Sequence, residues 1–271
     1  KLVDGRNFHD KMLGDSSSVV INDAFAKMKA DGVKELVLDL RYNGGGSVAT
    51  AVALGQMVTG QFTGSPYVAM EFNSKHSKYN SVDKLTQTMK TYDSNGNSTG
   101  TQNINSLGLN KIYVLTSHGT ASASELTIAG LRSYINVVTV GSETYGKFVG
   151  SITLYDAPAT DFLDADKRNK SHNWAMQPIT FAYYNLKKDM PTTGGYLPDY
   201  TVAPKEYFGK LKEFGNTSDP ALKKALELIT GQSVGRVAGT TLRDNPKEFI
   251  GNRRTLQQFG TELYLDHLKV K

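Results

Sequence analysis

Short apolar runs, two of which are followed by a turn and a helical pattern, constrain the fold of this chain most. Three such runs stand out, at residues 36–40, 111–116 and 136–140. A continuous apolar run of this length is typical of a strand that is buried on both faces. Helical patterns at residues 47–57 and 122–134 follow the first two runs. The sequence therefore predicts an α/β fold in which strands and helices alternate.

Further elements are predicted outside this alternating core. Periodicity and turn residues favour helices at residues 18–30, 221–229 and 254–267, and strands at residues 67–72, 152–155 and 175–184. The polar stretch at residues 73–110 contains a strong turn signal at residues 93–97, and we expect it to be a surface excursion. A chain of 271 residues with 39% hydrophobic content can bury a sizeable core, and we expect one main domain with appendages.

Composition excludes several classes of function. The 31 basic and 26 acidic residues are spread along the chain, so the net charge of +5 does not indicate nucleic-acid binding. The absence of cysteine excludes disulfides, thiolate metal sites and a cysteine nucleophile. No stretch approaches the roughly 18 to 20 apolar residues of a membrane span. The first residues show neither an initiator methionine nor a signal peptide, so we expect a processed or truncated product.

A serine among small residues and a lone lysine follow the second and third apolar runs. Ser122 lies in the string Thr-Ala-Ser-Ala-Ser-Glu, and Lys147 ends the string Gly-Ser-Glu-Thr-Tyr-Gly-Lys. Serine attacks an acyl carbon only when a base takes its proton and a donor stabilises the oxyanion. Lysine can be this base, because burial in an apolar pocket disfavours its ammonium form. The two residues are a candidate nucleophile and general base.

Backbone amides that could stabilise an oxyanion are expected in two places. Ser122 at the start of a helix would leave the amide of Ala123 as a free donor. The glycine run at residues 44–46 exposes further amides, and Gly45 or Gly46 could supply the second donor. Structural alternatives stay open. The glycines can simply form a tight turn, Ser122 can be an N-cap or packing residue, and the lysine can be a solvated surface residue.

Histidine offers a rival base. His118 lies shortly before Ser122, but within one strand-to-helix turn we expect it to face away. No histidine pair has metal-ligand spacing, and Asp161, Asp164 and Asp166 lack the glycine and closing glutamate of a calcium loop. The glycine run matches neither of the common nucleotide-binding patterns. We therefore expect no metal and no cofactor.

Three segments, taken together and in this order, resemble peptidase family S41, the carboxyl-terminal processing or tail-specific serine peptidases. Residues 38–46, Leu-Asp-Leu-Arg-Tyr-Asn-Gly-Gly-Gly, are similar to the family's strand and oxyanion loop. Residues 120–125 look like its nucleophile motif, and residues 141–147 look like its lysine motif. Pro-Asp at residues 198–199 is similar to its late turn. The resemblance covers roughly residues 18–203.

This resemblance implies a crotonase-like or ClpP-like α/β core and a set of site residues. It implies that Ser122 is the nucleophile and Lys147 the general base. It also implies that the amide of Ala123, together with that of Gly45 or Gly46, forms the oxyanion hole. The chain departs from the family pattern twice after the lysine. Phe148 stands where a glycine is usual. Ser151 stands where processing proteases commonly place a glutamine that orients the lysine amine, so its hydroxyl is the candidate for that third role.

The resemblance implies a serine endopeptidase that cleaves near the carboxyl ends of extended or unfolded polypeptides through a Ser-Lys acyl-enzyme. The alternative is a non-catalytic binding module that keeps the S41 fold, an option that Phe148 and Ser151 leave open. We expect a catalytic core at residues 1–204 and a helical extension at residues 205–271. Neither a PDZ domain nor the family's first core strand is found before residue 18. The implied setting is extracytoplasmic, in a bacterial periplasm or cell envelope, with a polypeptide substrate and a homo-oligomer as an option.

Overall fold

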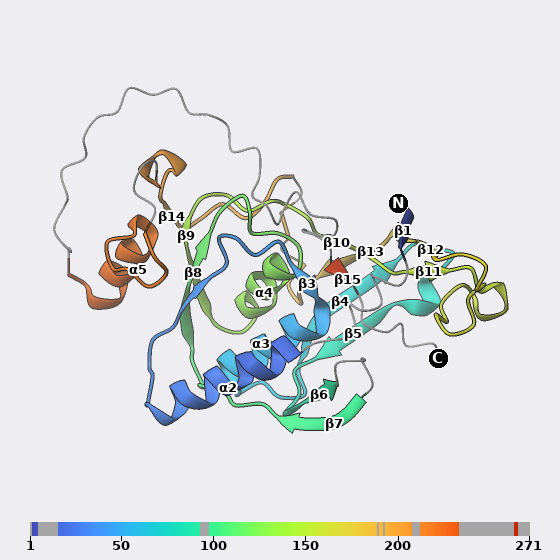
Figure 1. Cartoon of the computed structure of the whole chain (residues 1–271). Coiled ribbons are helices and arrows are strands. Elements are labelled where there is room, and N and C mark those ends of the chain that lie inside the picture. Colours follow the sequence, from blue (N-terminus) through green and yellow to red (C-terminus); the bar gives the residue numbers. More distant parts are fainter. Residues whose placement is uncertain are drawn as a thin grey trace.

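A four-stranded parallel sheet forms the centre of the computed structural model, which describes residues 2–4, 16–92, 98–188, 190–191, 193–207, 212–232 and 263–264. Its strand order is β14, β9, β8, β2, and Figure 1 labels the first three of these strands. The bounds are Val37–Asp39 for β2, Lys111–Thr116 for β8, Asn136–Gly141 for β9 and Tyr200–Thr201 for β14. The three apolar runs of the sequence are β2, β8 and β9, which confirms the predicted α/β class.

Both faces of the strand β8 are covered, which explains its nearly continuous apolar run. On β8, Ile112 and Val114 join the main core under the helices α3 (Val48–Thr59) and α4 (Ala123–Arg132). The alternate residues Tyr113 and Leu115 join a second cluster with Ala221 and Ala225 of α5 (Pro220–Thr230). Successive side chains of a strand point to opposite faces, so one run serves two cores. The helix α2 (Ser16–Ala30) packs against α3.

A second, mixed sheet lies beside the helices α3 and α4. Its strand order is β3, β15, β10, β13, β4, β5 (Figure 1). The bounds are Gly46–Ser47 for β3, Leu263–Tyr264 for β15, Val149–Ser151 for β10, Ile179–Tyr184 for β13, Pro66–Phe72 for β4 and Ser81–Lys84 for β5. The pairs from β10 to β5 are antiparallel, whereas β15 pairs in parallel with both of its neighbours.

Two smaller antiparallel sheets complete the fold. One has the order β1, β12, β11, and the other is the hairpin of β6 and β7. Their bounds are Leu2–Asp4, Trp174–Met176, Leu154–Tyr155, Thr88–Tyr92 and Ser98–Asn103. Three short 3₁₀ helices lie at Ser77–Tyr79, Pro158–Thr160 and Pro204–Tyr207.

Several predictions from the sequence need correction. Residues 73–110 are more than a surface excursion, because they contain β5, β6 and β7 and bury Leu85 and Met89. The helix predicted at residues 254–267 is wrong at Leu263–Tyr264, which form β15, and its other residues lie outside the described ones. A strand, β1, does precede α2, although it belongs to a small sheet. The turn predicted at residues 93–97 lies outside the described residues.

A tyrosine ring fills the space between the helices α3 and α4. Tyr67 of β4 is fully buried, and its hydroxyl donates to the carbonyl oxygen of Thr127 at 3.2 Å. A Cβ atom at Gly55 of α3 would lie 2.6 Å from this ring, and one at Gly130 of α4 would also collide with it. The two glycines therefore create the slot in which the ring lies. No helix in the described part of the chain is long and apolar enough to cross a bilayer.

Candidate active site

Ser122 lies in the turn between β8 and α4, in a backbone conformation that is rare for a residue with a side chain. Its φ of 61° and ψ of −117° are costly for any residue other than glycine. Such strain at a strand-to-helix turn is the way that several hydrolases present a nucleophilic serine. The residue is fully buried, and its Oγ has no hydrogen-bond partner among the described residues. The hydroxyls of Ser133, Thr180 and Tyr207 are also buried without a partner among the described residues, so Ser122 is distinguished by the combination of this feature with its strained backbone.

The carboxylate of Glu125 joins the serine turn to the lysine loop. Its Oε2 accepts hydrogen bonds from the amides of Ser122 at 2.8 Å and Lys147 at 2.9 Å. Its Oε1 accepts from the Gly146 amide at 2.7 Å and from the Thr144 hydroxyl at 2.5 Å. Glu125 is fully buried, so all four donors compensate a charge that is removed from water. The backbones of the candidate nucleophile and candidate base are thus held to one oxygen atom.

A second bridge between the same two residues comes from the mixed sheet. The hydroxyl of Tyr183 in β13 lies 3.0 Å from the carbonyl oxygen of Ser122 and 3.3 Å from that of Lys147. Burial, and then the charge of Glu125, raise the pKa of Tyr183 well above its usual value. The hydroxyl therefore stays protonated and remains a donor.

The glycine loop after β2 packs directly on the serine turn. The carbonyl oxygen of Asn43 accepts from the Ala121 amide at 3.2 Å and from the Ser124 hydroxyl at 2.9 Å. A Cβ atom at Gly45 would lie 2.7 Å from the Cβ of Ser122, and Gly45 has a φ of 107°. Only glycine fits this position without strain, since both the conformation and the close approach exclude a side chain.

The three amides expected to form an oxyanion hole differ in their surroundings. Ala123 is the first residue of α4, where an amide has no partner within the helix. The Gly45 amide donates to Oδ1 of Asn43 at 3.0 Å, so it is engaged in this conformation. Gly46 belongs to β3, opposite Leu263. The amide of Ala123 thus lies at a helix start, the amide of Gly45 bonds to Asn43, and Gly46 lies in the strand that pairs with β15.

Lys147 and the residues after it enter the mixed sheet. Lys147 is partly buried, and β10 begins shortly after it and ends at the buried Ser151. Phe148, the departure from the family pattern, packs edge-on against the rings of Tyr183 and Tyr196, with centroids 6.1 and 5.5 Å apart. The phenylalanine is therefore part of the core beside the site. The structure brings the backbones of the serine and the lysine together and places Ser151 on the strand that leaves the lysine loop.

The rival histidine lies on the surface of the same turn. His118 is exposed, and its ring lies 5.3 Å from that of Tyr145. Ser122, in contrast, has no exposed surface. Among the described residues no group of three or more histidine, aspartate or glutamate side chains could hold a metal ion.

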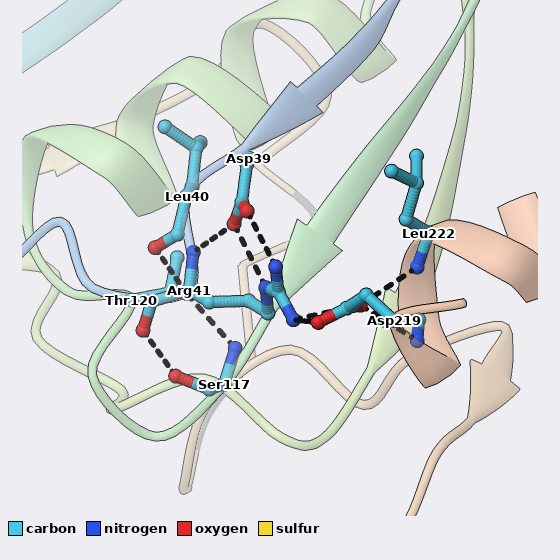
Figure 2. Close-up of polar contacts among 8 residues, drawn as sticks. Asp39, Leu40, Arg41, Ser117, Thr120, Asp219 and Leu222 are labelled. Atoms are coloured by element: carbon cyan, nitrogen blue, oxygen red, sulfur yellow. Dashed lines mark hydrogen bonds and ion pairs between the residues drawn. The ribbon is translucent and has the colours of Figure 1, made fainter. Parts of the chain in front are cut away.

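A buried ion-pair network supports the start of the glycine loop. Figure 2 shows Arg41, two residues after the end of β2, between the carboxylates of Asp39 and Asp219. Its guanidinium nitrogens lie 2.7 Å from Asp39 Oδ2 and 2.8 Å from Asp219 Oδ2. Burial lowers the pKa of Arg41, but the hydrogen bonds and charges of both carboxylates outweigh this effect and raise it overall. The Ser117 hydroxyl also donates to the Arg41 carbonyl oxygen.

No role was predicted from the sequence for Glu125, Arg41 or Asp219. Asp219 directly precedes α5, and its side chain accepts hydrogen bonds from the amides of Ala221 and Leu222. A charged residue beside a strand that is buried on both faces needs a partner. That signal could have marked Arg41, but it could not have identified a partner so distant in the sequence.

Comparisons with known proteins agree with this arrangement. The model of peptidase family S41 matches residues 8–202. A tail-specific protease of Haemophilus influenzae is 24% identical over 86% of this chain and 29% of its own length. A probable CtpA-like serine protease of Staphylococcus haemolyticus is 28% identical over 70% of this chain and 35% of its own length. The chain thus spans about a third of the length of these relatives.

A solved structure is also similar to this chain. A crystal structure of an S41 protease from Bacteroides fragilis is similar, with a TM-score of 0.63 and 25% identity, over 78% of this chain and 48% of that one. The family model matches well over half of the sequence, including the serine turn, the lysine loop and the glycine loop. The chain belongs to peptidase family S41.

Proposed function

We propose that this chain is a serine endopeptidase in which Ser122 is the nucleophile and Lys147 the general base. The observation that carries the proposal is the strained and buried Ser122, whose hydroxyl has no partner among the described residues and whose backbone shares Glu125 with Lys147. Strain of this kind persists only where the surrounding structure enforces it, and it is concentrated at functional sites.

The proposed reaction is acyl transfer in two steps. The Ser122 Oγ attacks the carbonyl carbon of a peptide bond while the neutral amine of Lys147 takes its proton. The amides of Ala123 and Gly46 then stabilise the negatively charged oxygen. The carbon–nitrogen bond breaks, and the lysine gives the proton to the leaving amine. Water next attacks the acyl-enzyme and its proton passes to the lysine. The bond between the acyl carbon and the Ser122 Oγ then breaks, the lysine returns the proton to the Oγ, and the new carboxyl terminus leaves.

We propose Ser151 as a positioning residue for the lysine amine. It is buried at the end of β10, the strand that continues from the lysine loop. A hydroxyl there can accept a hydrogen bond from an amine and so restrict the conformations of a long side chain.

The proposed substrate is an extended or unfolded polypeptide, cleaved near its carboxyl end. The support for this substrate class is the family membership and the name of the Haemophilus influenzae relative, a tail-specific protease. An extended chain can add to a sheet edge and bind mainly through its backbone. We also propose an extracytoplasmic setting in bacteria, as a further expectation from the family.

A fluorophosphonate probe tests the nucleophile directly. The probe reacts covalently with an activated serine, so we expect one adduct per chain, mapped to Ser122 by mass spectrometry. The variants Ser122→Ala and Lys147→Ala should not be labelled, whereas His118→Ala should be labelled like the original chain. Loss of labelling in His118→Ala, with Lys147→Ala unaffected, would replace the lysine by the histidine as base.

Cleavage itself is tested with a disordered protein whose new termini are mapped by mass spectrometry. We expect fragments close to its carboxyl end that are absent with Ser122→Ala. A well-folded chain that is neither labelled nor active would instead support the alternative, a binding module with the S41 fold.

A further inference from the structure

A strand from the end of the sequence lies between two strands of the candidate active site. β15 pairs in parallel with β3 on one side and with β10 on the other (Figure 1). Leu263 is opposite Gly46, and Tyr264 is opposite both Ser47 and Ser151. Neighbouring strands of a sheet lie about 4.8 Å apart. The gap between β3 and β10 therefore has the width of one extended strand, and we call it the strand gap.

The strand gap adjoins the candidate nucleophile. Gly45, which directly precedes β3, approaches the Ser122 side chain closely enough to exclude a Cβ atom. On the other side of the gap, β10 follows the loop of Lys147. An extended peptide in the gap has main-chain partners on both sides and lies next to the serine turn. This is the position that a polypeptide needs for attack by Ser122.

In this structure such a peptide cannot enter the strand gap. β15 takes the strand gap, and Ser122 has no exposed surface. A substrate carbonyl must come into contact with the serine hydroxyl before reaction. A substrate can therefore pair with β3 and β10 only in molecules from which β15 has withdrawn.

We propose that β15, Leu263–Tyr264, binds in the strand gap of its own molecule as a substrate mimic and inhibits the peptidase. This inference rests on the proposed function, because that function makes the gap a substrate position. The occupant is held through β3 and β10, so it competes with any extended chain that uses the same main-chain groups. If β15 fills the gap nine-tenths of the time, the apparent KM is raised about tenfold.

Two proline substitutions in the full chain test the competition. Leu263→Pro/Tyr264→Pro removes two backbone donors from β15 and disfavours the strand. The matched control is Lys269→Pro/Val270→Pro, which introduces two prolines at positions that follow β15 in the sequence. We expect the first variant to lower the apparent KM for a disordered substrate about tenfold at an unchanged kcat, and the control to leave KM unchanged. Equal KM values in all three proteins would overturn the inference.

A binding measurement tests the same inference without turnover. The unchanged sequence and the double-proline variant at 263 and 264 are each combined with Ser122→Ala. Each protein is titrated into a dye-labelled peptide of residues 259–271 while the fluorescence anisotropy of the peptide is recorded. The peptide should bind the chain with prolines at 263 and 264 at least tenfold more tightly than the chain with its own tail. Leu263→Gly/Tyr264→Gly serves as a second variant in case the prolines disturb folding. Equal affinity of the peptide for the two proteins overturns the inference.

These experiments separate the two proposals. In one outcome, peptide binding depends on residues 263 and 264, but the probe never labels Ser122. This outcome rejects the peptidase activity and therefore also its inhibition, although the strand gap still binds peptides. Labelling and cleavage without any effect of the tail variants rejects only the inhibition. A KM that rises with protein concentration shows that the tail comes from a second copy, which overturns binding within one molecule.

Discussion

At the scale of single residues, one carboxylate holds the candidate site together. Glu125 accepts four hydrogen bonds from two segments, and two of them come from the amides of Ser122 and Lys147. The side chain touches neither residue's reactive group in these contacts, so its role is to position their backbones. Because it is buried, no water can replace an acceptor that is lost.

We predict that Glu125→Gln destabilises the fold and prevents labelling of Ser122. Glutamine has one acceptor oxygen and turns two N–H donors towards groups that are themselves donors. The expected loss in the free energy of unfolding is about 2–4 kcal/mol, measured by urea denaturation. The control Glu143→Gln changes an exposed carboxylate that accepts one hydrogen bond from the Gly195 amide, and should cost about 1 kcal/mol or less. Similar losses in the two variants would contradict the positioning role.

The sequence motifs marked the residues of the candidate site but not their conformations. The string of small residues marked Ser122, and the glycine run marked a close approach of backbone, which the structure places at Gly45. The positive φ of Ser122 could not be predicted from the sequence, because it results from contacts with residues of the glycine loop and the lysine loop. Those loops are brought together only by the tertiary fold.

At the scale of elements, α5 is anchored to the core at its first turn. Asp219 caps the helix through the amides of Ala221 and Leu222 and also pairs with Arg41 beside the glycine loop (Figure 2). One side chain thus joins the segment after residue 205 to the loop that carries the candidate oxyanion donors. This link explains why a helix beyond the expected core boundary at residue 204 packs on the central sheet.

We predict that two substitutions of Asp219 separate its two roles. Asp219→Asn keeps a capping oxygen and loses the charge, so its cost of about 1–3 kcal/mol reports the ion pair with Arg41. Asp219→Ala also removes the cap and should cost about 0.5–2 kcal/mol more. Both are measured by urea denaturation at low and high salt. The control Glu227→Gln removes a weaker pair with Lys224 at 3.7 Å and should cost below about 0.5 kcal/mol. Losses for Asp219 that vanish in salt would contradict a buried pair.

Element prediction succeeded where local pattern decides the structure. The helices α3, α4 and α5 and the strands β8 and β9 were predicted within a few residues, because their apolar period or their capping residues are local. At Leu263–Tyr264 the helical pattern was misleading, since this pair becomes a strand by pairing with β3 and β10. Strand formation depends on partners that can be far away in the sequence, and pattern alone does not reveal them.

At the scale of the whole molecule, the two large sheets meet at the candidate site. The serine turn follows β8 of the parallel sheet, whereas the lysine loop leads into β10 of the mixed sheet. Tyr183 of β13 joins them through the carbonyl oxygens of Ser122 and Lys147. Relative movement of the sheets would therefore change the distance between the candidate nucleophile and base.

We predict that Tyr183→Phe loosens this junction. The change removes the only polar atom of the side chain and leaves two buried carbonyl oxygens without that donor, which should cost about 1–2 kcal/mol in the free energy of unfolding. The rate of fluorophosphonate labelling should fall as well, by about tenfold or less. Tyr184→Phe is the matched control, because its ring faces Lys188 on the surface and the change should be nearly neutral. A neutral Tyr183→Phe would show that the sheets are held by other contacts.

The ring of Tyr67 has a consequence for redesign of this protein. Its slot exists because positions 55 and 130 both lack a side chain, so a methyl group at either one has room only if the ring is replaced by something smaller. A smaller residue at 67 without added bulk on the two helices would leave an empty volume instead. The three positions therefore behave as one unit in design, and libraries that vary them separately will recover few folded members.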